Sequence, residues 1–152
     1  MLKIYIDGAS RGNPGKASYA YIIKKRNKVL IEKCDYIGFT TNNVAEYMAF
    51  IKALEYIAIN FNEEKEVVVY SDSELVVKQL NGLYKVKSPE IRALYDKVMK
   101  YSKNFTRFSV IYIPRERNKK ADQLCNLSLD KNLDSNNNDH GGVNFGRSKK
   151  IY

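Results

Sequence analysis

Four carboxylates stand where segments of different type meet along the chain. Asp7 follows a short alternating run, Asp72 follows the apolar run 67–70, and Glu46 and Asp122 fall in the first turns of two predicted helices. Ends of neighbouring central strands meet at one edge of a sheet, so these groups are expected to converge. Gathered acids without basic partners repel one another, and hard divalent cations bound through oxygen relieve that repulsion.

This pattern predicts a magnesium site, or a manganese site, formed by the four acids. Two ions at such a site would act on both the attacking water and the leaving oxygen of a phosphodiester. Each acid taken singly also has a local explanation. Glu46 fits a capping box that begins at Asn43, Asp122 suits a helix N-terminus, and Asp7 and Asp72 suit turns. The metal site is therefore a hypothesis about the four together.

The charge of the chain favours a polyanionic partner. Lysine and arginine number 26 against 17 acidic residues, which gives a net charge of +9. Basic groups gain by displacing counterions from phosphates, although many basic proteins bind no nucleic acid. A basic protein that carries an acidic cluster has what a metal-dependent nuclease requires: cations for the backbone and carboxylates for the metal.

Composition excludes a membrane protein and predicts a cytoplasmic one. Hydrophobic residues make up 44% of the chain and charged residues 28%, as in ordinary soluble domains. No apolar run is long enough to span a membrane, and the first seven residues read as a strand rather than as a signal peptide. Cys34 and Cys125 lack metal-ligand spacing, so we expect small core or half-buried side chains, and no disulfide in a reducing compartment.

Hydrophobic periodicity gives the element order βββαβααβα. Strands are predicted over 2–7, 17–24, 28–37, 67–70 and 105–113, and helices over 44–59, 74–81, 90–102 and 119–129. Asn43 and Asn118 are the expected N-caps of the first and last helices. The fold class is therefore α/β. We expect a five-stranded mixed sheet, with three antiparallel strands followed by two parallel-paired strands and helices on both faces. Residues 1–129 form the expected domain, and 130–152 a polar tail, mobile or loosely docked.

Four segments resemble the motifs of type 1 ribonuclease H, in family order and with family-like spacing. They are Tyr5 to Gly15 (YIDGASRGNPG), Thr40 to Tyr47 (TTNNVAEY), Tyr70 to Ser73 (YSDS) and Arg117 to Leu124 (RNKKADQL). The resemblance covers residues 1–129 and agrees with the element order read from periodicity.

The resemblance implies a metal-dependent endoribonuclease that cuts the RNA strand of an RNA–DNA hybrid and leaves 5′-phosphate and 3′-hydroxyl ends. It implies Asp7, Glu46, Asp72 and Asp122 as catalytic and metal-binding acids, with two Mg²⁺ or Mn²⁺ ions when substrate is present. Positions that match hybrid contacts are Ser10, Asn13, Asn42 and Asn43. We expect a monomer that has the hybrid as its partner and no membrane.

The sequence departs from well-studied bacterial members in two places. The long basic insertion after the third motif is replaced by the short segment 81–89, which keeps Lys85 and Lys87 as a reduced phosphate-binding handle. This resembles the compact archaeal-type branch. The histidine that many members carry before the fourth acid is absent, and Arg115 or Arg117 is expected to stabilise phosphate charge instead. His140, the single histidine, falls in the tail, and Glu74 occupies a position where a neutral polar contact is expected.

Two alternatives use the same fold. One is a binding module for hybrids or other nucleic acids that has lost its activity, although all four acids are present. The other is a DNA nuclease, such as an exonuclease or junction resolvase, which the Asn42–Asn43 pair and the loop between Asp7 and Pro14 weigh against. A general protein-interaction domain would explain the charge but not the acids.

Overall fold

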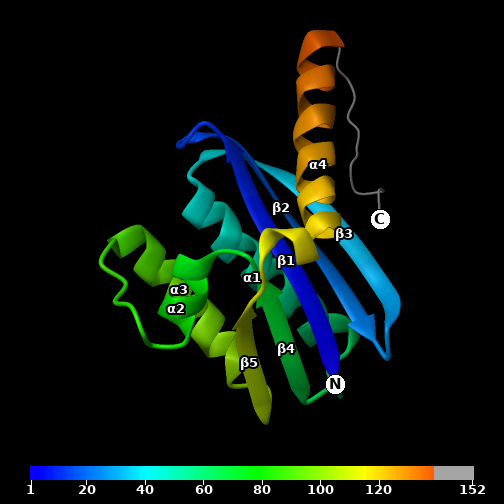
Figure 1. Ribbon diagram of the computed structural model, residues 1–152, viewed down its shortest axis with the longest axis vertical. Helices are drawn as coiled ribbons and strands as arrows, with labels where there is room; N and C mark the ends of the chain where they lie inside the picture. The colour runs from blue at the N-terminus through cyan, green and yellow to red at the C-terminus, as the bar shows by residue number, and fades with distance from the viewer. Residues whose placement is uncertain (139–152) are drawn as a thin grey trace.

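One five-stranded sheet organises the computed structural model, which describes residues 1–138. Its order is β3-β2-β1-β4-β5 (Figure 1). The strands are β1 (Leu2–Arg11), β2 (Gly15–Lys25), β3 (Lys28–Thr40), β4 (Glu66–Ser71) and β5 (Arg107–Tyr112). β1 to β3 form an antiparallel meander, while β4 pairs in parallel with both β1 and β5. The predicted mixed sheet is confirmed.

β1 is the central strand, and it is longer than its neighbour β4. Their parallel pairing ends where Tyr5 lies opposite Tyr70, yet β1 continues to Arg11. The side of β1 that faces β4 is therefore open at Asp7, just where the chain leaves β4 at Ser71 and reaches Asp72. This difference in length creates room for side chains between the two strand ends.

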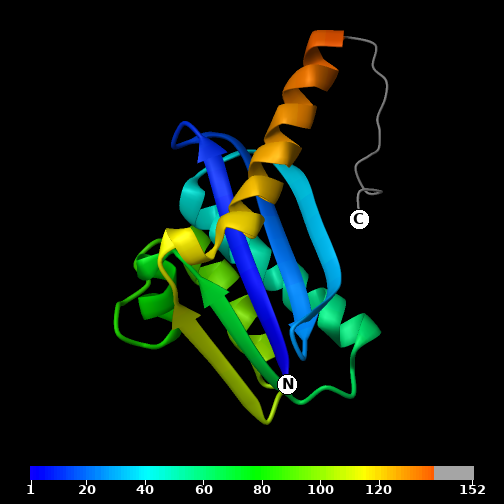
Figure 2. The same ribbon diagram turned by 45° about the vertical axis from the view of Figure 1, so that its right-hand side comes forward.

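Helices cover both faces of the sheet (Figure 2). α1 (Asn42–Asn60) lies on one face, with α2 (Glu74–Leu80) and α3 (Pro89–Ser102) on the same side. The large apolar core lies under α1 and includes Ile4 and Phe50. α4 (Lys119–Asn138) crosses the other face after a short 3₁₀ turn, η1 (Arg115–Arg117), and closes a smaller cluster.

Both cysteines are buried, and each keeps its thiol rather than forming a disulfide. Cys34 and Cys125 belong to the smaller cluster under α4. No helix within residues 1–138 combines the length and apolar character needed to cross a membrane.

The expected cap of the first helix is wrong by two residues. Thr41 is the N-cap of α1, with extended backbone, and its Oγ1 accepts a hydrogen bond from the backbone N–H of Val44 at 3.3 Å. The apolar period begins only at Val44, so periodicity missed the polar first turn that contains Asn42 and Asn43. Glu46 therefore lies beyond the capping positions, and its carboxylate is available for another role.

The last helix also differs from its prediction. The Asn118 side chain does not cap it, because Oδ1 has no hydrogen-bond partner within the described chain. α4 runs to Asn138 rather than to residue 129. The added turns project past the sheet (Figure 1), which is why their sequence shows no apolar period. At the start of these turns, Asp130 forms an ion pair with Arg11 at 2.7 Å. Residues 130–138 of the predicted tail therefore belong to α4, while residues 139–152, with His140, lie outside the described residues.

Gly8 allows β1 and α1 to touch backbone to backbone. A Cβ atom at this position would lie 2.3 Å from both the carbonyl carbon of Ala45 and the nitrogen of Glu46. Only a residue without a side chain permits this approach. The strand that carries Asp7 and the helix that carries Glu46 are thereby held against each other.

We predict that Gly8→Ala lowers the free energy of unfolding by roughly 3 kcal/mol, because the new methyl group forces two backbones apart. Urea unfolding measures this directly. Gly82→Ala is the control. A Cβ atom at that position would meet no other group within 4 Å, but the backbone φ is 78°, so the loss in the free energy of unfolding comes from backbone strain alone and should be about 1 kcal/mol. Equal losses in the two variants would contradict the assigned contact.

Candidate active site

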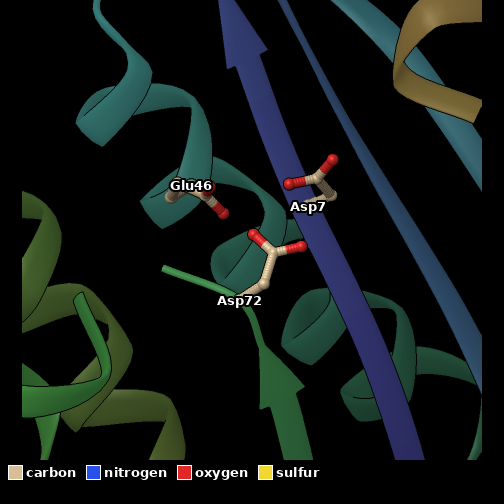
Figure 3. Close-up of side chains that lie close together, drawn as sticks. All are labelled: Asp7, Glu46 and Asp72. Carbon is tan, nitrogen blue, oxygen red and sulfur yellow. The ribbon is translucent and has the colours of Figure 1, made fainter. Parts of the chain in front are cut away.

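Three of the four predicted acids meet at the open end between β1 and β4. Asp7, Glu46 and Asp72 each present a carboxylate oxygen, and these oxygens all lie within 4.8 Å of one another (Figure 3). Asp7 is 5% exposed and Glu46 is 7% exposed, while Asp72 is half-buried. Residues that are far apart in the sequence thus form one compact acidic cluster.

Local structure sets the position of each carboxylate. The backbone N–H of Gly8 donates to Glu46 Oε1 at 3.1 Å, which joins α1 to the strand that carries Asp7. On the other side, Asn118 Nδ2 donates to Asp72 Oδ2 at 3.0 Å. The backbone of Asp7 is fixed by its pairing with β2, just beyond the point where the pairing with β4 ends.

Burial and mutual repulsion raise the pKa values of the two buried acids. Burial raises the pKa of Asp7 to about 8, with further increases from the charges of Asp72 and Asp122. Burial also raises the pKa of Glu46 well above its usual range, followed by the charges of Asp7 and Asp72. The Gly8 N–H and the Arg115 guanidinium oppose both increases, but they do not overcome them.

Asp122 lies near this cluster without joining it. Its carboxylate is not among the oxygens that meet within 4.8 Å, yet its charge raises the pKa of Asp7 from the first turn of α4. Asp122 is half-buried. It therefore faces the same site from the opposite layer of the fold.

The donor set of the cluster fits a hard divalent cation. Carboxylate oxygens are the ligands that Mg²⁺ and Mn²⁺ prefer. No salt bridge in the described part of the chain pairs a basic group with Asp7, Glu46, Asp72 or Asp122. Burying like charges without a cation is unfavourable, so a bound metal ion would relieve a repulsion that the protein leaves unbalanced.

Beside the acids, the first two motifs are hydrogen-bonded to each other. Asn42 Oδ1 accepts from the backbone N–H of Ser10 at 2.9 Å and from Ser10 Oγ at 3.0 Å. Asn13 Oδ1 accepts from the backbone N–H of Asn42 at 3.0 Å. Asn43 follows in the first turn of α1 and is half-buried. Three of the four predicted hybrid contacts thus form one network, whose hydrogen bonds orient both side-chain amides.

The predicted cationic contacts lie on two separate segments. Lys85 and Lys87 are exposed in the short connection between α2 and α3. Arg115 and Arg117 are exposed in η1; of these two, Arg115 lowers the pKa values of Asp7 and Glu46 and so stands toward the acids.

Two residues beside these segments were not assigned a contact role from the sequence. Lys78 Nζ lies 5.0 Å from the centre of the Tyr84 ring and pairs with Glu74 at 2.8 Å, so the unexpected acid at position 74 has a partner within its own helix. Asn118 was expected only as a cap. Its hydrogen bond to Asp72 joins residues far apart in the chain, and no local pattern could have indicated it.

Comparison with known proteins agrees with this geometry. A family model described as reverse transcriptase-like matches residues 5–128. A ribonuclease H1 isolated from compost, solved in complex with an RNA/DNA hybrid, aligns with a TM-score of 0.83 and 41% identity, over 88% of this chain and 99% of that chain. The ribonuclease H1 of the halophilic archaeon Halobacterium salinarum aligns with a TM-score of 0.81 and 37% identity, over 86% and 98%.

A bifunctional protein of Mycobacterium tuberculosis is 40% identical over 129 residues, which are 84% of this chain and 35% of that protein. The chain therefore spans about a third of the length of the mycobacterial relatives that it matches. A mixed sheet of this order, with carboxylates at the open end of its central strand, defines a protein of the ribonuclease H fold. Within that fold, the chain belongs to the type 1 ribonuclease H family, in a compact form with a short connection between α2 and α3.

The raised pKa of Asp7 predicts how stability depends on pH without metal. The folded carboxyl keeps its proton up to about pH 8, whereas the unfolded one loses it near its ordinary value of 3.8. The folded state therefore binds more protons in this window, and the free energy of unfolding falls as pH rises from about 4 to about 8. In EDTA at pH 8, we expect the free energy of unfolding of Asp7→Asn to be higher than that of the wild type by at least about 1 kcal/mol.

Urea unfolding at a series of pH values checks this expectation. Added MnCl₂ at pH 8 should stabilise the wild type and have little effect on Asp7→Asn, because a ligand that binds only the folded state raises its stability. Equal pH slopes for the two proteins would contradict the electrostatic description of the cluster.

Proposed function

We propose that this chain hydrolyses the RNA strand of RNA–DNA hybrids and leaves 5′-phosphate and 3′-hydroxyl ends. The observation that carries the proposal is the cluster of Asp7, Glu46 and Asp72. Two of these acids are buried, and none forms an ion pair with a basic side chain of residues 1–138. Family membership and the hybrid bound to the compost ribonuclease H1 support the choice of substrate.

The four acids are proposed as catalytic groups that hold two Mg²⁺ or Mn²⁺ ions when substrate is bound. Asp7, Glu46 and Asp72 supply the oxygens that already converge, and Asp122 approaches from α4. When bound, such ions lower the pKa of an attacking water and stabilise the charge on the leaving oxygen. The water oxygen forms a bond to phosphorus, the bond to the 3′-oxygen breaks, and that oxygen takes up a proton.

The remaining side chains are proposed to bind and orient the hybrid. Ser10, Asn13, Asn42 and Asn43 would contact the RNA strand in the shallow groove, where the 2′-hydroxyl both donates and accepts hydrogen bonds. Arg115 stands close enough to the acids to stabilise phosphate charge, with Arg117 beside it. Lys85 and Lys87 would contact phosphates farther along the duplex.

A monomeric state and a cytoplasmic location stay predictions. The absence of membrane association stays a prediction as well.

We predict that Asp7→Asn, Glu46→Gln and Asp72→Asn each reduce hybrid cleavage by several orders of magnitude, because each removes a charged ligand from the cluster. A gel assay with labelled RNA in a hybrid and added MgCl₂ or MnCl₂ measures this. Asp96→Asn is the control: Asp96 is an exposed acid of α3 that forms an ion pair with Arg92, and this variant should cleave like the wild type.

The same assay with other substrates separates the nuclease of hybrids from the DNA nuclease and from the inactive binding module. Duplex DNA and duplex RNA are tested beside the hybrid. Cleavage of DNA would favour a DNA nuclease, and tight hybrid binding without metal-dependent cleavage would leave only a binding module. Full activity in all three cluster variants would overturn the assignment of the site.

We also predict that the double variant Lys85→Ala, Lys87→Ala binds the hybrid more weakly without a change in kcat. Each lost phosphate contact should reduce the slope of log K against log salt by roughly 0.9. Lys103→Ala is the control, because Lys103 follows α3 at the end of the sheet opposite the acids. An unchanged slope of log K against log salt in the double variant would rule out phosphate contacts by Lys85 and Lys87.

A further inference from the structure

Asn118 connects three elements at the acidic cluster although it is not one of the acids. It lies between η1 and α4 and is 2% exposed. Its Nδ2 donates to the carbonyl oxygen of Ile6 on β1 at 2.8 Å and to Asp72 Oδ2 at 3.0 Å. One amide nitrogen thus uses both of its hydrogens, one on the central strand and one on a carboxylate of the cluster.

The orientation of this amide is determined by Asp72 and Ile6. Asn118 Oδ1 is buried and has no partner within residues 1–138. A buried acceptor without a hydrogen bond costs on the order of 1–3 kcal/mol. The reversed amide would place Oδ1 against two acceptor oxygens and would remove the hydrogen bond that Asn118 now donates to each, which is worse. The protein therefore retains an unpaired oxygen in order to direct the nitrogen at Asp72.

We propose that Asn118 is a positioning residue that orients the Asp72 carboxylate for divalent-metal binding. Because Asp72 Oδ2 is held by Nδ2, the carboxylate cannot turn freely away from Asp7 and Glu46, toward which it lies in Figure 3. The same residue begins α4, where its carbonyl oxygen accepts from the backbone N–H of Asp122 at 3.2 Å. Asn118 thereby sets two of the four acids relative to β1, and this role rests on the proposed function.

Loss of such outer contacts typically weakens metal binding by about 10–100-fold. We expect Asn118→Ala to raise the Kd for Mn²⁺ by at least about tenfold, as measured by calorimetry or electron paramagnetic resonance on the full chain without nucleic acid. Hybrid cleavage should lose kcat and require more metal, while KM for the hybrid at saturating metal stays within about twofold, because Asn118 is buried away from the groove contacts.

Asn81→Ala is the control, at a more exposed site. Asn81 Nδ2 also donates to a strand carbonyl, that of Val110, at 3.0 Å, and no hydrogen bond within residues 1–138 joins it to an acid of the cluster. This variant should lose some stability to urea and keep the wild-type Kd for Mn²⁺. If Asn118→Ala does not fold, Asn118→Leu decides, because it keeps a side chain of similar size and removes the donor without adding a charge or a metal ligand; its Kd for Mn²⁺ should also rise by at least about tenfold.

The outcomes separate the two levels of the proposal. Wild-type protein that binds Mn²⁺ but does not cleave the hybrid would overturn the proposed function. Wild-type cleavage combined with an unchanged Mn²⁺ affinity in the folded Asn118 variant would overturn only the positioning role. An equal loss of Mn²⁺ affinity in Asn81→Ala would also overturn it, since the effect would then reflect general destabilisation.

Discussion

Repulsion among buried carboxylates is the constraint on which the arrangement of this protein depends. Asp7 and Glu46 are almost completely removed from water, next to Asp72 and within reach of the charge of Asp122. Water can no longer screen these groups, and no basic side chain is bonded to them among the described residues. Protons or divalent cations must balance the cluster, and this gives the site its proposed affinity for metal.

The fold holds these groups together against their repulsion. The early end of the β1–β4 pairing leaves space beside Asp7, and the absence of a side chain at Gly8 brings the start of α1 against β1. Hydrogen bonds from the Gly8 N–H and the Asn118 amide hold Glu46 and Asp72. Rigid elements on both faces of the sheet therefore maintain a geometry that the carboxylates alone would not adopt.

Sequence reasoning succeeded where hydrophobic periodicity was strong. The five strands, the element order and the mixed sheet follow from alternating and continuous apolar runs, such as the buried run from Val67 to Val69. It failed at helix ends. Thr41 rather than Asn43 caps α1, because a polar first turn carries no periodic signal. The sequence predicts an end of α4 at residue 129, because the residues beyond it carry no apolar period, yet the helix continues to Asn138 and projects past the sheet (Figure 1).

The sequence by itself determined the candidate acids, the basic character of the chain and the likeness of its motifs to type 1 ribonuclease H, because residue type and order along the chain carry that information. Only the tertiary structure decided that three acids share one cluster while Asp122 lies beside it. It also decided that the Asn118 side chain donates a hydrogen bond to Asp72 instead of capping α4. The physical reason is that desolvation and hydrogen bonding depend on distances between segments far apart in the chain, which no local pattern records.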